Sequence, residues 1–226
     1  MTHRATHLVT GAGSGIGAVL ARRLLDRGDE VVLLARSAER AAELRTTYDG
    51  ATVLVADLAG PESMESLALP DRLDSVVHAA GVVRLGPVAD LTVDDWAGQL
   101  RVNLVAPAAL TRVALPALRA ARGTVVLVNS GAGLFAHPGW SAYAASKHGL
   151  RALADALRAE EPDLRVTSVY PGRTATPMQE EVHRQEGKEY DPGQWIRPET
   201  VADAILHVLD LPRDATISDL TVRPGG

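Results

Sequence analysis

The sequence predicts one α/β domain built on a mostly parallel, doubly wound sheet of seven strands. Short Val- and Leu-rich runs alternate with longer stretches of helical period along the whole chain. These runs are apolar throughout, which is typical of parallel strands that helices cover on both faces. The 226 residues have the length of one domain, and no linker or change of composition divides them. We therefore expect residues 1–226 to form a single domain.

The first part of the chain predicts three strands that alternate with two helices. A glycine-rich turn follows the first strand, and Ser37 is a candidate N-cap for the second helix. This strand, helix, strand, helix, strand order is that of one mononucleotide-binding half. The expected strands are 7–10, 31–35 and 52–56, and the expected helices are 18–27 and 37–47.

The second part of the chain predicts four more strands separated by helices. The expected strands are 75–79, 124–129, 165–170 and 217–222, and the expected helices are 92–121, 141–160 and 198–209. Residues 173–197 show no clear periodicity and are rich in Gly, Pro, Glu and Gln. A long loop in a compact domain is usually a lid or a binding segment. We therefore expect residues 173–197 to form a substrate loop.

Composition and charge exclude several classes of function. The chain has no Cys, which excludes disulfides, thiolate zinc sites and a cysteine nucleophile, and its His residues do not combine into a metal site. A formal net charge of −5 argues against nucleic acid and anionic membrane as partners. No apolar run approaches the roughly 18 residues of a membrane span. We expect a cytoplasmic protein without a metal.

The glycine-rich turn after the first strand is a candidate phosphate site. Glycines allow positive φ and let backbone N–H groups approach a pyrophosphate, whose charge a helix N-terminus stabilises. The string Thr10-Gly-Ala-Gly-Ser-Gly-Ile-Gly17 fits both G-x-G-x-x-A, continued to Ala18, and T-G-x-x-x-G-x-G. The turn between a strand and a helix predicts dinucleotide binding, and a glycine-rich turn without a ligand is the alternative.

The end of the second expected strand indicates which dinucleotide is bound. An acidic residue normally holds the adenosine ribose there, but this strand ends in Ala35 and Arg36, followed by Ser37. An Arg without a nearby carboxylate favours a 2′-phosphate and hence NADP over NAD. A solvent-exposed Arg that opens a helix is the alternative. Asp57, after the third strand, is a candidate acceptor for the adenine amino group or an N-cap.

Three side chains of complementary chemistry are expected to meet at the carboxyl edge of the sheet. Tyr143 and Lys147 are spaced i, i+4 on one helix face, and Ser130 follows the fifth strand. A neighbouring ammonium lowers the pKa of a phenol from its ordinary value of about 10. Such a Tyr can give a proton to a carbonyl oxygen while a hydride reaches the carbon. On its own, Y-x-x-x-K also fits a solvated helix face.

Together these motifs resemble the short-chain dehydrogenase/reductase family in its shorter, single-domain form. The resemblance rests on T-G-x-x-x-G-x-G, on a Ser thirteen positions before Tyr, and on Y-x-x-x-K. It spans residues 6–222 and implies a three-layer Rossmann fold that binds NADP, with NAD less favoured. It continues in His78-Ala-Ala-Gly81, Asn103, Pro171-Gly172, Thr176 and Met178.

The resemblance implies a role for each matching residue. Tyr143 would be the catalytic acid/base, Ser130 would hydrogen-bond the substrate oxygen, and Lys147 would bind the nicotinamide ribose and lower the pKa of Tyr143. Asn103 would hold a water that relays protons to Lys147, and Thr176 would bind the nicotinamide carboxamide. The other positions expected to contact the cofactor are Gly11, Gly13, Ser14, Gly15, Ile16, Gly17, Arg36, Ser37, Asp57, Leu58, Ala79, Ala80, Gly81, Pro171 and Gly172.

Two positions depart from the pattern of the family. The family commonly has Asn where His78 stands, which affects support of the central sheet more than chemistry. Many members that prefer NADP have a basic residue where Ser14 stands, so the phosphate would rest mainly on Arg36 and Ser37. Between Ser130 and Tyr143, and in the substrate loop, five further residues are candidates for the pocket wall: Leu134, Phe135, His137, Trp140 and Trp195.

The sequence thus predicts an NADP-dependent oxidoreductase that transfers a hydride between the nicotinamide and a small carbonyl or alcohol substrate. A non-catalytic NADP-binding regulatory or scaffold protein is the alternative, but such relatives typically lack the Tyr or the Lys. A sugar-nucleotide epimerase would need a larger C-terminal domain than this chain has. The Ala-rich helices at 92–121 and 141–160 suit packing across a two-fold axis, and the resemblance implies a homodimer or homotetramer.

Overall fold

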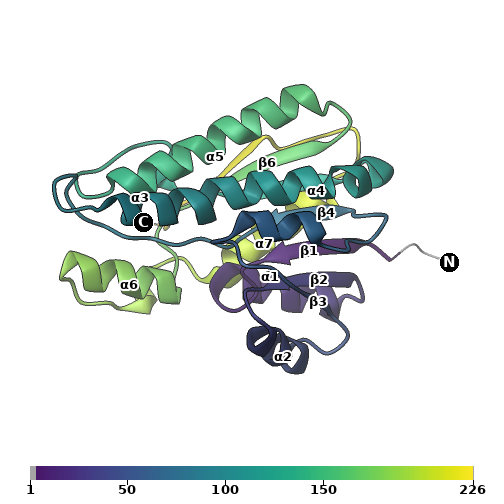
Figure 1. Cartoon of the computed structure of the whole chain (residues 1–226), viewed down its shortest axis with the longest axis horizontal. Helices are drawn as coiled ribbons and strands as arrows, with labels where there is room; N and C mark the ends of the chain where they lie inside the picture. Colours follow the sequence, from purple (N-terminus) through teal and green to yellow (C-terminus); the bar gives the residue numbers. More distant parts are fainter. Residues whose placement is uncertain (1–3, 226) are drawn as a thin grey trace.

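The computed structural model describes residues 4–225 and shows helices on both faces of one sheet (Figure 1). Within these residues, seven strands pair in parallel in the order β3-β2-β1-β4-β5-β6-β7. The strands are β1 (Thr6–Thr10), β2 (Glu30–Ala35), β3 (Thr52–Val55), β4 (Ser75–His78), β5 (Thr124–Val128), β6 (Arg165–Pro171) and β7 (Asp219–Val222). This confirms the predicted α/β class and the doubly wound, Rossmann-type sheet.

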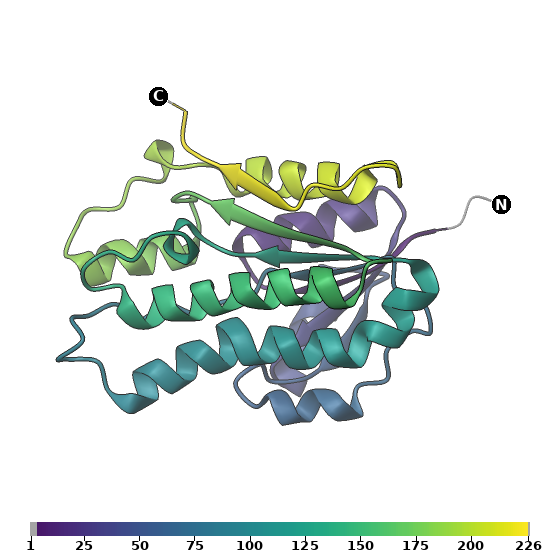
Figure 2. The same cartoon turned by 90° about the horizontal axis from the view of Figure 1, so that it is seen from above.

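Two apolar layers hold the helices to the sheet. Successive strand residues point to opposite faces, so Val9 packs on one side and its neighbour Leu8 on the other. Helices α1, α2 and α7 cover the face of Val9, and α4 and α5 cover the face of Leu8 (Figure 2). The helices are α1 (Gly15–Asp26), α2 (Ala38–Thr47), α3 (Val93–Leu100), α4 (Ala106–Ala121), α5 (Ser141–Glu160), α6 (Pro177–Glu186) and α7 (Pro198–Asp210).

The long helical region before β5 is continuous but not uniform. A π-helical turn, Arg101–Val105, joins α3 to α4. The whole stretch Val93–Ala121 has the length and apolar composition of a membrane span, although its sequence contains no uninterrupted apolar run of that length. Leu110 and Leu118 of this stretch are fully buried against the sheet. The apolar side chains of α4 therefore form part of the core between this helix and the sheet.

The expected substrate loop, residues 173–197, is not a loop throughout, and this part of the prediction was wrong. It contains helix α6 and a short 3-10 turn, Pro192–Gln194. Thr176 caps α6 by accepting a hydrogen bond from Gln179 N, and Gly187, with φ +66°, ends it. The helix is mostly polar, so its apolar period is too weak to detect. We call residues 173–197 the substrate segment below.

The strand order reverses between β1 and β4, and this places the site. Chain connections leave β1 toward β2 on one side and β4 toward β5 on the other. Parallel sheets bind ligands in the crevice beyond the carboxyl ends of the strands at such a point. The turn after β1 and the loops after β4, β5 and β6 all lie at this edge.

Candidate active site

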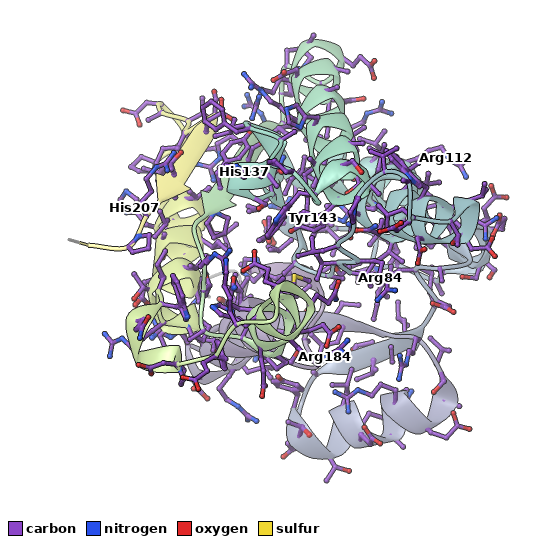
Figure 3. All side chains as sticks on the ribbon, turned by 90° about the vertical axis from the view of Figure 1, so that its left-hand side faces the viewer. Arg84, Arg112, His137, Tyr143, Arg184 and His207 are labelled. Carbon is purple, nitrogen blue, oxygen red and sulfur yellow. The ribbon has the colours of Figure 1, made fainter. Side chains whose placement is uncertain are left out.

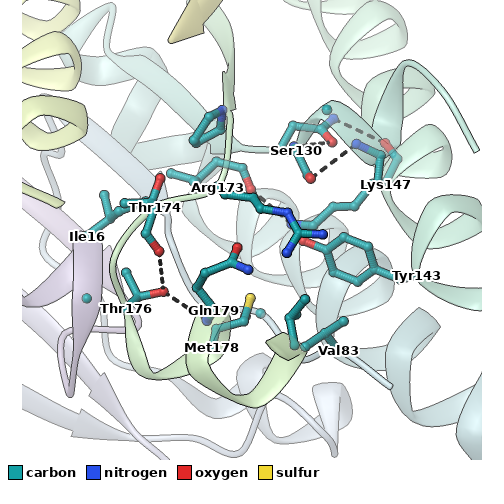
Figure 4. A pocket seen from close by; sticks show the side chains of 18 of the residues that line it. Ile16, Val83, Ser130, Tyr143, Lys147, Arg173, Thr174, Thr176, Met178 and Gln179 are labelled. Atoms are coloured by element: carbon teal, nitrogen blue, oxygen red, sulfur yellow. Dashed lines mark hydrogen bonds between the residues drawn. The ribbon is translucent and has the colours of Figure 1, made fainter. Parts of the chain in front are cut away.

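A cavity of about 610 Å³ lies at the carboxyl edge of the sheet (Figure 4). Figure 3 looks onto this end of the molecule, with Tyr143 at the centre between the segment that carries His137 and helix α6, which carries Arg184. The cavity brings together most of the residues that the sequence predicted for the site. Those in its wall are Gly11, Ser14, Gly15, Ile16, Ala79, Ala80, Gly81, Ser130, Tyr143, Lys147, Pro171, Gly172 and Thr176.

The remaining predicted residues lie outside the wall of this cavity: Gly13, Gly17, Arg36, Ser37, Asp57, Leu58 and Asn103. Arg36 and Asp57 are exposed where β2 and β3 end, beside the glycine-rich turn in the sheet order. Ser37 caps α2 by accepting a hydrogen bond from Arg40 N at 3.2 Å. Asp57 is not an N-cap, because the next helical turn, Pro61–Ser66, has Gly60 in that position. Asp57 Oδ1 accepts a hydrogen bond from Ala59 N at 3.0 Å. Leu58 packs on the core under α4.

The ends of β1 and β4 touch each other at the glycine-rich turn. Thr10 Oγ1 accepts hydrogen bonds from Ala79 N and Ala80 N, both at 3.1 Å. Gly11 has φ +77°, and a Cβ at this position would lie 2.7 Å from Ala80 N. Only glycine fits there, because both the backbone conformation and the space exclude a side chain.

The glycine-rich turn has room for a phosphate at the start of α1. Gly15 has φ +57°, and a Cβ on it would lie 3.0 Å from Thr176 Cγ2. A Cβ on Gly17 would meet Gly11 O at 2.5 Å, so Gly17 is needed to pack α1 on the turn. The Ser14 side chain makes no capping hydrogen bond to α1, which leaves the first N–H groups of this helix for an anionic ligand. The turn therefore fits the pyrophosphate of a dinucleotide.

Asn129, which the sequence analysis left without a role, fixes Ser130 and joins it to α5. Its Oδ1 accepts a hydrogen bond from Ser130 N at 2.8 Å, and its Nδ2 donates to Lys147 O at 3.1 Å. Ser130 Oγ accepts from Ala132 N at 3.1 Å and also forms a hydrogen bond with Tyr143. The serine hydroxyl and the phenol thus lie side by side, as the sequence predicted.

Burial sets the protonation of both Tyr143 and Lys147. It raises the pKa of Tyr143 to about 12, and the hydrogen bond with Ser130 opposes this shift. It lowers the pKa of Lys147 to about 8. The expected lowering of the Tyr143 pKa by Lys147 is therefore not found in this structure. Lys147 Nζ lies 5.8 Å from the centre of the Tyr143 ring and donates to Val128 O at 3.0 Å.

Asn103 supports the site from the π-helical turn. Its Oδ1 accepts from Val82 N at 2.9 Å, and its Nδ2 donates to Val82 O at 2.9 Å and to Ser146 Oγ at 3.0 Å. It makes no direct hydrogen bond to Lys147. A Cβ on Gly81 would lie 3.3 Å from Asn103 Oδ1 and 3.9 Å from Lys147 Nζ, so the glycine keeps the space between these two groups open.

The end of the cavity beyond Tyr143 contains two of the residues expected in the pocket wall. His137 and Trp140 line the cavity, whereas Leu134, Phe135 and Trp195 do not, and Phe135 is 64% exposed. Tyr143 packs edge-on against Trp140. The sequence analysis named no role for several further wall residues, among them Val83, Arg173, Gln179, Val182 and Glu186. For Arg173 there was a signal, because it directly follows Pro171-Gly172.

The fold and the cavity together define a class of protein. A glycine-rich turn built for a dinucleotide faces a buried phenol, hydroxyl and ammonium in one cavity. This combination is that of a nicotinamide-dependent oxidoreductase. The chain belongs to the short-chain dehydrogenase family, since the family model for short chain dehydrogenases matches residues 5–187.

Known proteins similar to this chain agree with the family. An uncharacterised short-chain type dehydrogenase/reductase of Sinorhizobium fredii is 32% identical over 97% of this chain and 91% of its own length. The crystal structure of an alcohol dehydrogenase from Thermococcus sibiricus, complexed with 5-hydroxy-NADP, has a TM-score of 0.85 and 26% identity, with 98% of this chain and 97% of that one covered.

A further solved structure carries the reduced cofactor. It is a putative short chain dehydrogenase of Escherichia coli complexed with NADPH, with a TM-score of 0.86 and 28% identity over 96% of this chain and 95% of that one. The chain is therefore a short-chain dehydrogenase/reductase, an oxidoreductase that binds a nicotinamide cofactor.

Proposed function

We propose that the protein reduces carbonyl compounds with NADPH, or oxidises the corresponding alcohols with NADP⁺, and that Tyr143 is the acid/base. The observation that carries this proposal is the buried pair of Tyr143 and Ser130, which share a hydrogen bond in the wall of the cavity. Lys147 lies beside this pair, and the glycine-rich turn opens into the same cavity.

In the direction of reduction, Ser130 and Tyr143 both donate hydrogen bonds to the carbonyl oxygen. A nicotinamide cofactor held at the glycine-rich turn would supply the hydride for the new C–H bond. The O–H bond of Tyr143 breaks as the substrate oxygen takes its proton, and the phenolate then recovers a proton from solvent. Each turnover consumes one NADPH and one proton. With a pKa of about 12, Tyr143 is fully protonated at neutral pH and is ready to donate.

The phenol can be tested with Tyr143→Phe. We expect turnover of carbonyl substrates to be lost, because the variant lacks the hydroxyl that donates the proton to the carbonyl oxygen, while NADPH binding is retained. The measurement is NADPH oxidation together with the NADPH dissociation constant. Tyr190→Phe is the matched control, because Tyr190 packs on His183 and does not line the cavity. Full activity in Tyr143→Phe would overturn the mechanism.

The same assay tests the alternative of a regulatory or scaffold protein. Such a protein would bind NADPH tightly and oxidise none of it across aldehydes, ketones, quinones and keto esters. Two features argue against it: the phenol and the ammonium are both present, and the cavity extends from the glycine-rich turn past Tyr143 to Arg173 and Glu186.

The preference for NADP is proposed from the basic side chains beside the glycine-rich turn. Arg36 is exposed at the end of β2, and Arg40 Nη2 donates to Gly13 O at 3.2 Å. Both guanidinium groups are therefore candidates to hold a 2′-phosphate. Among the other predicted properties, the homodimer or homotetramer and the cytoplasmic location stay predictions.

The cofactor preference can be measured with Arg36→Ala. We expect the NADPH dissociation constant to rise by about 10-fold, because a charge-assisted hydrogen bond is lost, while that of NADH changes little. Arg112→Ala is the control, because Arg112 lies on α4 and pairs with Glu65. Equal losses for NADPH and NADH would contradict the assignment of Arg36 to the 2′-phosphate.

A further inference from the structure

We propose that Arg173 binds a carboxylate group of the substrate, so that the substrates of this enzyme are oxo acids and hydroxy acids. The inference rests on the proposed function, since it names the class of carbonyl compound that reaches Tyr143. It assigns a specificity role to a residue that lies two positions after the end of β6.

Arg173 lies in the wall of the cavity that also contains Tyr143 and Ser130. Figure 4 shows its side chain extending from the end of β6 into this cavity, on the side where Tyr143 lies. The side chain is 29% exposed, so the guanidinium is accessible to a ligand but partly shielded from bulk water. A charge in such a position interacts more strongly with a ligand than a fully solvated charge does.

Neighbouring groups hold the guanidinium in place before any ligand arrives. Its Nη2 donates to both carboxylate oxygens of Glu186, at 2.7 and 3.0 Å. The guanidinium also lies 5.5 Å from the centre of the Trp195 ring. Because these contacts fix the side chain, a ligand would lose little binding free energy in ordering it.

The contacts of Arg173 leave donors for a ligand. A guanidinium has five N–H donors, and Glu186 engages only Nη2. The Nη1 group has one neighbour at the limit of hydrogen bonding, His183 Nε2 at 3.5 Å, and Nε donates no hydrogen bond within residues 4–225. Nε and Nη1 point in different directions, and either can donate a charge-assisted hydrogen bond to a carboxylate oxygen.

The charges around this end of the cavity favour an anion. Besides Lys147 beside Tyr143, the wall contains the cation Arg173 and the anion Glu186. Lys188 also contacts Glu186, at 3.0 Å, so two cations neutralise one carboxylate. The net charge of Arg173, Lys188 and Glu186 together is therefore +1, and Arg173 has N–H groups that can still donate to a ligand.

The test uses three oxo acids that differ in the separation of carbonyl and carboxylate: pyruvate, acetoacetate and levulinate. Each is compared with its methyl ester, which keeps the carbonyl and removes the charge. We expect kcat/KM of the wild-type enzyme to favour the acid of at least one pair by about 10-fold or more, the effect of a hydrogen bond to a charged group. In Arg173→Met this ratio should fall to about one. Arg173→Lys should give an intermediate ratio, because it keeps the charge but loses the fixed positions of the guanidinium donors.

Arg184→Met is the matched control. Arg184 lies on the exposed side of the same helix, α6, and pairs with Glu181, so its replacement should leave the ratio of acid to ester unchanged. Thermal unfolding and NADPH affinity of each variant show whether the fold and the cofactor site are intact. The proposal is overturned if acids and esters react equally well, or if Arg173→Met keeps the acid preference. Arg173 would then only stabilise α6 through its contact with Glu186.

A second measurement needs no turnover and separates this proposal from the proposed function. Butanoate and its uncharged match butanamide are titrated by calorimetry into protein saturated with NADP⁺. We expect butanoate to bind the wild type at least about 10-fold more tightly than butanamide, and this difference to disappear in Arg173→Met. If no carbonyl is reduced but butanoate is bound in this way, the proposed function fails and the carboxylate site stands. If butanoate and butanamide bind equally well but the esters are still reduced, the carboxylate site is overturned and the proposed function stands.

Discussion

At the residue scale, one physical cause shifts the pKa values of Tyr143 and Lys147 in opposite directions. Burial disfavours the charged form of each group, which is the phenolate of one and the ammonium of the other. Between about pH 8 and pH 12 both side chains are therefore neutral in the free protein. A bound substrate and cofactor change this balance only by placing new charges or hydrogen bonds in the cavity.

The buried ammonium of Lys147 costs stability that its replacement should recover. Its pKa in the folded state, about 8, lies below the ordinary 10.5, so the cost is present in full below pH 8 and disappears as the pH rises to about 10.5. The shift corresponds to about 3 kcal/mol, and loss of the hydrogen bond to Val128 O offsets about 1 kcal/mol of this.

We therefore expect Lys147→Met to unfold in urea with a free energy about 1–2 kcal/mol higher than the wild type at pH 7. At pH 10.5 this advantage should be gone, and the variant should have lost its oxidoreductase activity at every pH. Urea unfolding curves at the two pH values check the prediction. A variant that is less stable than the wild type at pH 7 would contradict it.

At the element scale, α6 is the helix that the apolar pattern of the sequence did not predict. Strands β1 to β6 and the larger helices were predictable, because buried strands and amphipathic helices have strong apolar periods. In α6 only Gln179, Val182 and His183 are buried, and two of these are polar. Its boundary signals, Pro177 at the first position and Gly187 after the last, were present in a segment that otherwise resembles a loop.

A substitution at Gly187 tests whether its left-handed backbone conformation stabilises the C-terminal end of α6. It has φ +66°, and no atom lies within 4 Å of the place where a Cβ would stand, so Gly187→Ala introduces backbone strain alone. We expect a loss of about 1 kcal/mol, with faster amide hydrogen exchange in the last turn of α6. Gly98→Ala in α3 is the control, because its Cβ also meets open space but its φ is not positive. Unchanged exchange in α6 would show that the helix end tolerates the strain.

Site residues could be predicted where the helix or strand that carries them could be predicted. Tyr143, Lys147 and Ser130 follow from helix spacing and from the carboxyl edge of a strand, and the structure brings them together. The π-helical turn that presents Asn103 leaves no trace in the apolar period, because it inserts within a continuous helix. The partners of Arg173 depend on how α6 folds back over the cavity, which no local pattern contains.

At the scale of the whole molecule, His78 links the central sheet to acid stability. It lies on β4, is 3% exposed, and its Nε2 shares a hydrogen bond of 2.9 Å with Thr111 Oγ1 of α4. Burial lowers the pKa of His78 to about 3, far below the ordinary 6.5, so the folded protein holds this ring neutral. The pKa of His7 on β1 is also lowered by burial.

The free energy of unfolding should therefore fall as the pH drops below about 6.5, because the unfolded chain binds the protons that the folded ring excludes. For His78 alone the loss is about 2 kcal/mol between pH 6.5 and pH 5. We expect His78→Asn to flatten this pH dependence, and His7 to account for part of the slope that remains. Denaturant unfolding from pH 5 to pH 8 measures both slopes, and identical slopes in the variant and the wild type would contradict the assignment.

Helix α6 contacts both the glycine-rich turn and Arg173, which lie in different parts of the cavity wall. At its start, Thr176 lies against Gly15 of the cofactor turn, and in its last turn Glu186 holds Arg173 at the substrate end. A displacement of this one helix therefore alters the affinities for cofactor and substrate together. In thermodynamic terms the two ligands are linked, and whatever factor the first contributes to the binding of the second, the second contributes equally to the binding of the first.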